Sequence, residues 1–234
     1  MKNLKIVNKS KLFLGKYWGI IAIFITTSIA FIGIADIITS HIEQQRLREE
    51  EKEKLDYQLN IFRSESELKY DKYKCDLVEV VQSYIDSVAP TSALNGYTIV
   101  CLSEKYDLDI KFVLAQGQIE SCFGTKGMAS KTNSVFNVGA YDNASHEEIH
   151  SKFKYSHPDY SVEPYMVLLY KDYIVNNKTE LDLMSKFVNK NGKRFSSNTH
   201  YEKDLLEMYS KIDNVTNITQ LQGEMHRYKI ICGK

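Results

Sequence analysis

The chain has 234 residues, and its 30 basic and 30 acidic side chains give a formal net charge of zero. Hydrophobic residues make up 43% of it and charged residues 26%, which is typical of a globular protein. The balanced charge argues against a nucleic acid as partner, because phosphate binding requires an excess of basic residues. The length allows one domain of about 150 residues and an additional segment.

The four cysteines show no Cys-x-x-Cys spacing, which argues against a structural zinc site. A single disulfide between Cys101 and Cys122 would require an oxidising compartment. We favour the alternative, in which the cysteines are separate small side chains in the interior.

An uncharged apolar segment follows a basic N-terminus. It extends from Tyr17 to Ala35, and as a helix these residues would span about 28 Å, close to the thickness of the hydrocarbon core of a bilayer. Residues 1–16 carry lysines and no acidic residue, so the positive-inside rule predicts a cytoplasmic N-terminus. A cleaved signal peptide would need a shorter apolar core and a small-x-small cleavage site. We therefore expect a retained membrane anchor over residues 17–38, in contact with the lipid bilayer.

Residues 39–76 are rich in charge and contain no proline or glycine. Positive and negative side chains alternate from Arg46 to Lys54, which favours a solvated helix with pairs at i and i+4. The apolar residues of this segment do not keep a heptad, so it gives only weak support for self-association through a coiled coil. We expect a helical stalk that acts as a spacer.

Residues 77–213 are predicted to form a mainly α domain, and residues 214–234 a tail without a clear signal. Apolar residues at helical spacing start the domain and stop at Pro90. Asp109, Ser161 and Thr179 are expected to cap later helices. The insertion from Gly124 to Tyr160 lacks helical periodicity and suits loops and a short hairpin. The helices expected after Pro90 cover residues 94–106, 110–122, 161–176, 179–188 and 199–212.

Glu120 is the clearest candidate for a catalytic residue in this sequence. It lies in the last turn of the helix expected from Ile110, where the partial negative charge of the helix end disfavours a carboxylate. Burial beside Phe123 and Phe136 would raise its pKa toward neutrality, and carboxylic acids of that kind cleave glycosidic bonds. Taken alone, a glutamate near a helix end is more often a surface residue.

Four segments of the sequence form a recognisable set. They are Ala115-Gln116 with Ile119-Glu120-Ser121 and Gly124-Thr125, Asn133–Asn137, Lys152–Tyr155 with Ser161 and Tyr165, and Gly192–Tyr201. In this order they resemble the lysozyme-like peptidoglycan hydrolases, and most closely the bacterial and phage glucosaminidase family, to which lytic transglycosylases are related. The similarity spans about residues 94–212. Cys122 and Phe195 depart from the family pattern, which usually has a small residue and a tyrosine there.

The resemblance implies a mainly α, α+β lysozyme-like domain with a short irregular or β insertion, acting on the glycan strands of peptidoglycan without metal or organic cofactor. Glu120 would be the general acid, and Tyr201 would place its hydroxyl near the scissile sugar unless it is merely a packed tyrosine. The substrate-binding residues that we expect from it are Gln116, Ser121, Phe136, Asn137 and Tyr165.

The second carboxylate is not decided by the sequence. An inverting mechanism places a base roughly 6.5–9.5 Å from the acid, and a retaining one needs a closer nucleophile or help from the substrate. Relatives carry a second glutamate shortly before the Phe-x-x-Tyr segment, and Glu148 is a slightly better match than Glu147, with Asp142 and Asp159 as outliers. If none of these reaches the sugar, a transglycosylase reaction with one acid–base residue is available.

These observations predict a membrane-anchored peptidoglycan hydrolase of the endo-β-N-acetylglucosaminidase type, with its domain in the periplasm or outside the membrane. A lytic transglycosylase or muramidase acting on the same polymer is the nearest alternative. A non-catalytic wall-binding or assembly protein with the same fold is another. A cysteine peptidase is disfavoured, because no histidine stands in a pattern that would activate Cys122.

Overall fold

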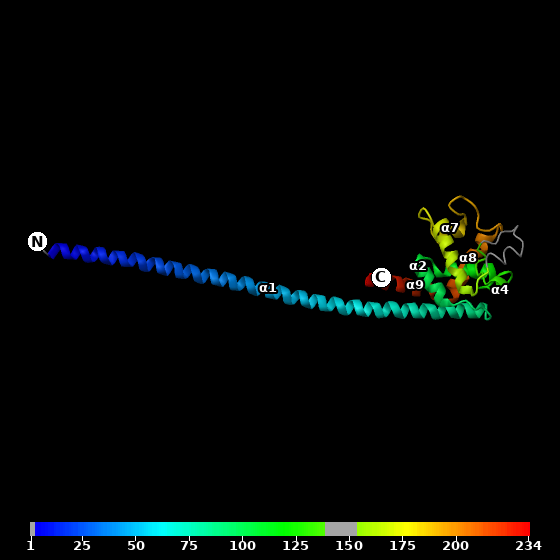
Figure 1. The fold of residues 1–234 in the computed structure, drawn as a ribbon, viewed down its shortest axis with the longest axis horizontal. Helices are drawn as coiled ribbons and strands as arrows, with labels where there is room; N and C mark the ends of the chain where they lie inside the picture. The colour runs from blue at the N-terminus through cyan, green and yellow to red at the C-terminus, as the bar shows by residue number, and fades with distance from the viewer. Residues whose placement is uncertain (1–2, 139–153) are drawn as a thin grey trace. The chain divides into compact units, whose positions relative to one another are not determined.

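A computed structural model describes residues 3–138 and 154–234. They form two compact units, Met1–Phe62 and Arg63–Lys234, and helix α1 contributes to both (Figure 1). The elements in chain order are α1 (Asn3–Val88), α2 (Gly96–Tyr106), α3 (Ile110–Ser121), α4 (Ala129–Thr132), the 3-10 helix η1 (Pro158–Ser161), α6 (Val162–Leu168), the π-helix η2 (Leu169–Tyr173), α7 (Glu180–Ser185), α8 (Tyr201–Val215) and α9 (Ile218–Cys232).

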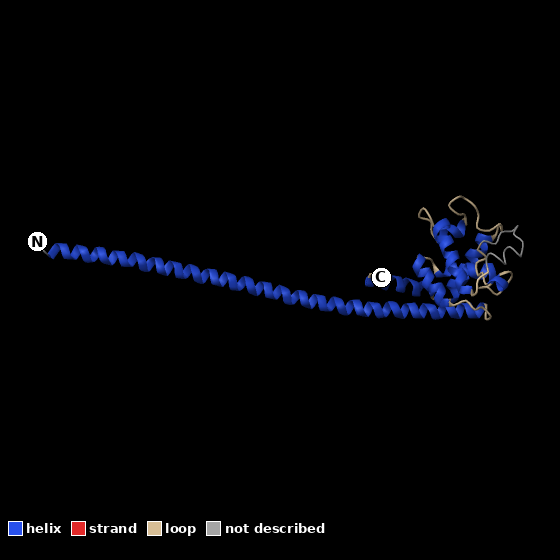
Figure 2. Cartoon of the chain, in the orientation of Figure 1, coloured by secondary structure: helices blue, strands red, loops and turns tan. Residues whose placement is uncertain are grey.

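The mainly α fold is confirmed. Within the described ranges no strand is present, and the β-type pairing is an isolated bridge between Val188 and Arg194 (Figure 2). The short hairpin expected between Gly124 and Tyr160 is absent from residues 124–138 and 154–160, which form turns, α4 and η1. The rest of that insertion lies outside the described residues. All four cysteines are free, so the alternative disulfide is not formed.

The first unit contains the candidate membrane anchor. Among the described residues one helix is long and apolar enough to cross a membrane, and its candidate span starts at Tyr17. Its large isoleucine and phenylalanine side chains are exposed in the isolated chain. The hydroxyls of Thr26, Thr27 and Ser28 donate to backbone carbonyls one turn earlier, at 2.8–3.1 Å. Such internal bonds are the means by which polar side chains are tolerated in hydrocarbon.

The core of the second unit is built around α3. Every residue from Ile110 to Gly117 is buried, so α3 is enclosed on all sides rather than on one face. It packs against α2, α8 and α9. The cap expected at its start is confirmed, because the Asp109 carboxylate accepts the Lys111 backbone N–H at 2.8 Å. Only the last turn of α3 reaches partial exposure, and it carries Glu120.

Two further caps behave differently from one another. Thr179 caps the start of α7, as the sequence predicts, and the structure adds a reciprocal capping box with Asp182. Ser161 does stand before α6, but its side chain makes no capping bond, and the prediction of a side-chain cap is wrong. Its hydroxyl instead donates to the Pro158 carbonyl at 2.7 Å and accepts the Val135 N–H at 3.0 Å. The 3-10 turn η1 occupies the position that a cap would fill, and Ser161 joins α6 to the loop beneath it.

The second unit is larger than the predicted domain of residues 77–213. Tyr70 of α1 is 7% exposed, and its hydroxyl donates to Glu104 of α2 at 2.6 Å. Glu104 also pairs with Lys74 at 2.7 Å and with Lys229 of α9 at 3.3 Å. The tail after Asp213, for which the sequence gives no clear signal, contains helix α9. Ile218, Leu221 and Met225 of this helix are buried. The segment of α1 after Arg63 and helix α9 are parts of the same packed unit.

We predict that a chain starting at Arg63 is more stable than one starting at Leu77. The shorter chain loses the buried ring of Tyr70, the Lys74–Glu104 ion pair and the stacking of Tyr73 on Tyr228, whose ring centroids are 5.7 Å apart. Because burying one aromatic side chain contributes about 1.5–3 kcal/mol, the loss should be at least about 2 kcal/mol. Urea denaturation of the two chains measures it, and equal unfolding midpoints would contradict the role given to this segment.

Candidate active site

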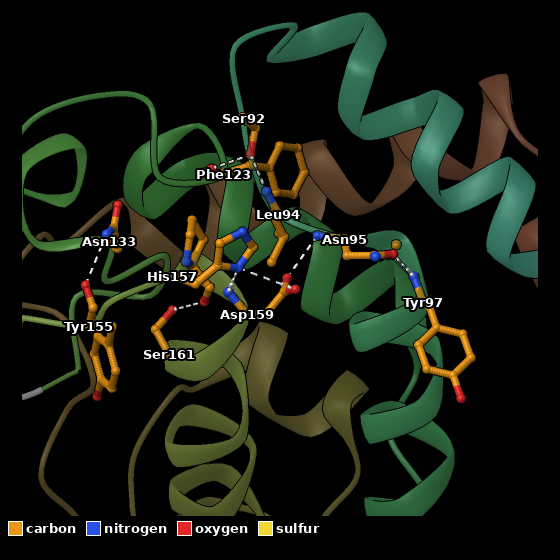
Figure 3. Close-up of polar contacts among 12 residues, drawn as sticks. Ser92, Leu94, Asn95, Tyr97, Phe123, Asn133, Tyr155, His157, Asp159 and Ser161 are labelled. Atoms are coloured by element: carbon orange, nitrogen blue, oxygen red, sulfur yellow. Dashed lines mark hydrogen bonds and ion pairs between the residues drawn. The ribbon is translucent and has the colours of Figure 1, made fainter.

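Glu120 is held at a sharp turn of the backbone. Helix α3 ends at Ser121, and the next two residues, Cys122 and Phe123, both have left-handed backbone angles, with φ of 50° and 54°. Non-glycine residues adopt this region at a cost of about 1–2 kcal/mol each. The turn is held because the Phe123 N–H donates to the Gly117 carbonyl at 3.0 Å and the Ser92 hydroxyl donates to the Phe123 carbonyl at 2.7 Å (Figure 3).

Glu120 is partly exposed, and neutral side chains donate hydrogen bonds to its carboxyl and to its backbone carbonyl. The Tyr201 hydroxyl of α8 donates to its Oε1 at 2.7 Å, and the Asn137 side-chain amide donates to the Glu120 backbone carbonyl at 2.9 Å. No lysine, arginine or histidine of the described residues forms an ion pair with Glu120. Burial raises the pKa of Glu120 above its usual value, and the hydrogen bonds from Tyr201 and Asn137 oppose that rise without cancelling it.

Tyr201 is itself fixed from the inside of the protein. It is 4% exposed, and its oxygen accepts a hydrogen bond at 3.0 Å from the Nε2 of Gln116, which is fully buried. Burial, together with the neighbouring Glu120, raises the pKa of Tyr201 well above its usual value. The phenol therefore keeps its proton near neutral pH and can donate it in a hydrogen bond.

Four of the five side chains expected to bind substrate lie in the interior. Gln116 bonds Tyr201, and the Ser121 hydroxyl donates to the Val135 carbonyl at 2.6 Å while accepting the Gly124 N–H at 2.7 Å. Phe136 and Tyr165 stack on each other, with ring centroids 3.7 Å apart and an angle of 7° between the planes.

These four side chains surround and support the end of α3 rather than present a surface to a ligand. Asn137 is the one of the five that remains partly exposed.

The two phenylalanines expected beside Glu120 pack against the α3 backbone three residues before it. A Cβ atom added at Gly117 would lie 3.1 Å from the Phe123 ring and 3.3 Å from the Phe136 ring, so both rings pack directly on the α3 backbone. Both phenylalanines are 1% exposed. Glycine at this position permits the close approach of the rings.

The candidates for the second carboxylate are not brought to Glu120 by the described structure. Glu148, Glu147 and Asp142 lie outside the described residues. Asp159 accepts the Asn95 N–H at 2.8 Å and lies 3.3 Å from His157 (Figure 3). It therefore joins η1 to the start of α2 and is occupied in a structural role.

An aromatic cluster behind Tyr201 was not predicted. Phe187 stacks on Phe195 with centroids 4.5 Å apart, and both rings lie within 6 Å of the Tyr201 ring. Glu202 accepts the Phe187 N–H at 3.1 Å and pairs with Arg194, which attaches this cluster to the first turn of α8. The signal in the sequence was the pair of phenylalanines just before the tyrosine motif, whose apolar rings need a partner to cover them.

We predict opposite pH dependences of stability for two glutamate variants. The pKa of Glu120 is raised on folding, so its stabilising contribution is complete at low pH and is lost as the pH rises through its folded pKa. Glu120→Gln should accordingly gain stability relative to the parent as the pH rises from 4 to 8.

Glu104→Gln is the matched control with the opposite sign. Burial works against ionisation of Glu104, but hydrogen bonds from Lys74 and Tyr70 outweigh it and lower its pKa. Its contribution is present near neutral pH and is lost as the pH falls, so this variant should be most destabilised near pH 7. Free energies of unfolding in urea across the pH range measure both effects. Parallel curves for the two variants would contradict the electrostatic description of Glu120.

A comparison with protein families identifies the domain that carries this arrangement. The family model described as Glucosaminidase, mannosyl-glycoprotein endo-beta-N-acetylglucosaminidase, matches residues 97–214, half of the chain. No curated protein matches the chain significantly. The matched region runs from α2 to the end of α8 and contains both Glu120 and Tyr201. The chain therefore belongs to the glucosaminidase family, and its domain supports a function as a peptidoglycan hydrolase.

Proposed function

We propose that the protein cleaves the β-1,4 glycan backbone of peptidoglycan as an endo-β-N-acetylglucosaminidase, with Glu120 as the general acid. The observation that carries this proposal is a carboxyl group with a raised pKa, held at 2.7 Å by a tyrosine hydroxyl and without a cation among the described residues. A general acid must be protonated near the working pH and must still reach the substrate. Partial exposure at the end of a buried helix meets both needs.

In this mechanism the Glu120 proton passes to the glycosidic oxygen while the bond from that oxygen to the anomeric carbon breaks. A water molecule adds to the anomeric carbon, and the second carboxylate takes its proton. Glu120 is left as a carboxylate, and the Tyr201 O–H already points at its Oε1. A hydrogen bond to a charged acceptor is stronger than one to a neutral acceptor, so Tyr201 stabilises the product of the proton transfer. Asn137 keeps the end of α3 in place through the Glu120 carbonyl.

Glu148 is the candidate for the second carboxylate, with Glu147 and Asp142 as rivals. The segment that contains all three follows Asn137 directly in the chain, and Asn137 contacts Glu120. The bond from the Tyr155 N–H to the Thr132 carbonyl, 2.7 Å long, joins the described chain on either side of this segment. If none of the three acts, a reaction of the lytic transglycosylase type produces an anhydro sugar that is lighter by one water.

Glu120→Gln should lower the rate of glycan cleavage by at least about 100-fold, because general acid catalysis typically contributes 10²–10⁴-fold. Clearing of purified cell wall in a zymogram and mass spectrometry of the released fragments measure the loss and identify the bond that is cut. Glu207→Gln is the matched control, since Glu207 lies exposed on α8 and should leave the rate unchanged.

Equal clearing by the Gln variant and the parent would remove the acid assignment. No clearing by the parent itself, with binding to the wall retained, would favour a wall-binding protein instead.

We further propose that residues 17–38 anchor the protein in a membrane with the glucosaminidase domain on the extracytoplasmic side. The candidate span from Tyr17 and the lysines before it support this orientation. We expect the full chain to require detergent, whereas a chain starting at Arg63 should remain in solution without it. Ultracentrifugation of both chains tests the anchor. Full-length protein that stays in the high-speed supernatant without detergent would contradict it.

A further inference from the structure

The buried amide of Gln116 is oriented with its nitrogen, and not its oxygen, toward the Tyr201 hydroxyl. Its Nε2 donates to the Tyr201 oxygen at 3.0 Å, and its Oε1 has no hydrogen-bond partner within the described structure. Gln116 is fully buried, and an unpartnered buried polar atom costs free energy, so the arrangement needs a reason. Turning the amide over would give Oε1 a partner but leave the nitrogen donors without one, which is the rarer situation in proteins.

Three side chains form a continuous chain of donors. Gln116 and Glu120 are four residues apart and so lie on the same face of α3, and Tyr201 of α8 bridges them. A phenol has one proton to donate. Because the Gln116 N–H already fills an acceptor position on the Tyr201 oxygen, the phenol proton is directed to Glu120 Oε1.

We propose that Gln116 is a positioning residue that keeps the transferable proton of Glu120 on Oε2. Since Oε1 accepts the hydrogen bond from the Tyr201 hydroxyl, a protonated Glu120 must carry its own proton on the other oxygen, which is the one left for the glycosidic bond. The inference rests on the proposed function, because it assigns the acid role to Glu120. It replaces the expectation that Gln116 contacts the substrate.

The other polar groups near Glu120 and Tyr201 leave the hydrogen bond from Tyr201 to Glu120 in place. On α6 the Tyr165 hydroxyl is buried without a hydrogen-bond partner among residues 3–138 and 154–234, and burial together with Tyr201 and Glu120 raises its pKa well above the usual value. On α8, Glu202 is occupied by Arg194 at 2.5 Å, and in the loop Asn137 donates its amide. With no cation of the described residues paired to Glu120, burial and the neutral hydrogen bonds that oppose it set the balance between its two protonation states.

The test compares Gln116→Met with Gln116→Glu in the full chain in detergent. Methionine removes the donor, so the carboxylate form of Glu120 loses stabilisation and the basic limb of the pH–rate profile should move up by roughly 0.5–1 pH unit. The kcat should fall about tenfold without a change in KM, because Gln116 does not touch substrate.

Glutamate has the shape of glutamine but accepts the Tyr201 proton when ionised, so its loss of kcat should exceed that of methionine. A role in packing alone would give the opposite order.

Gln118→Met is the matched control on the same helix. The Gln118 side chain accepts a hydrogen bond from Tyr84 and is not among the groups that shift the pKa of Tyr201 or Glu120, so its removal should leave the pH limb in place. Titration of the Glu120 carboxyl by carbon NMR gives a second readout that needs no turnover. The pKa of Glu120 should be higher in Gln116→Met than in the parent, whatever the activity of Glu120→Gln. A fully active Glu120→Gln variant would contradict the proposed function but not the role of Gln116 in setting this pKa.

Three results would overturn the inference: a Gln116→Glu variant as active as the parent, an unshifted Glu120 titration in Gln116→Met, or a raised KM with an unchanged pH limb.

Discussion

The free-energy cost of burying the Glu120 carboxyl, with no counter-charge paired to it in the part of the chain that the structure describes, is the constraint on which the site depends. Burial favours the neutral acid, and the Tyr201 hydroxyl at 2.7 Å returns part of the lost stabilisation to the carboxylate. A lysine or arginine in the same place would lower the pKa and leave no proton to donate. The fold meets the constraint through α3, which is enclosed along most of its length and opens only at its last turn. One turn of helix therefore separates the buried Gln116 from the partly exposed Glu120.

The parts of the fold that the sequence predicts are those set by local chemistry. The cap at Asp109 and the start of α3 follow from a side chain bonding a backbone N–H within two residues. The capping box at Thr179 has the same local origin. The position of Glu120 at the end of α3 follows from the same local reading, whereas its proposed role rests on four short segments that resemble one family.

The features that were missed depend on contacts between residues far apart in the chain. Helix α9 has little contrast between its faces, yet Lys229 reaches Glu104 and Tyr228 stacks on Tyr73. Likewise a motif records that Gln116 and Tyr165 occur, but not whether their polar atoms face a ligand or the interior. Both are buried, because α8 and the Phe136 ring close over them. The sequence alone therefore does not separate a polar residue that supports the acid from one that contacts the sugar.

The packing of α3 against α8 also sets the geometry of the hydrogen bonds to Glu120 and Tyr201. Gln116 and Glu120 belong to α3, and Tyr201 stands at the first position of α8, so the chain of donors crosses the interface between the two helices. Hydrogen bonds of 3.0 and 2.7 Å tolerate little sliding of one helix past the other. The Phe187–Phe195 stack and the Arg194–Glu202 pair fix the start of α8, although none of these four side chains forms a hydrogen bond with Glu120. Residues that hold Tyr201 in register are in this way part of what determines where the proton of Glu120 resides.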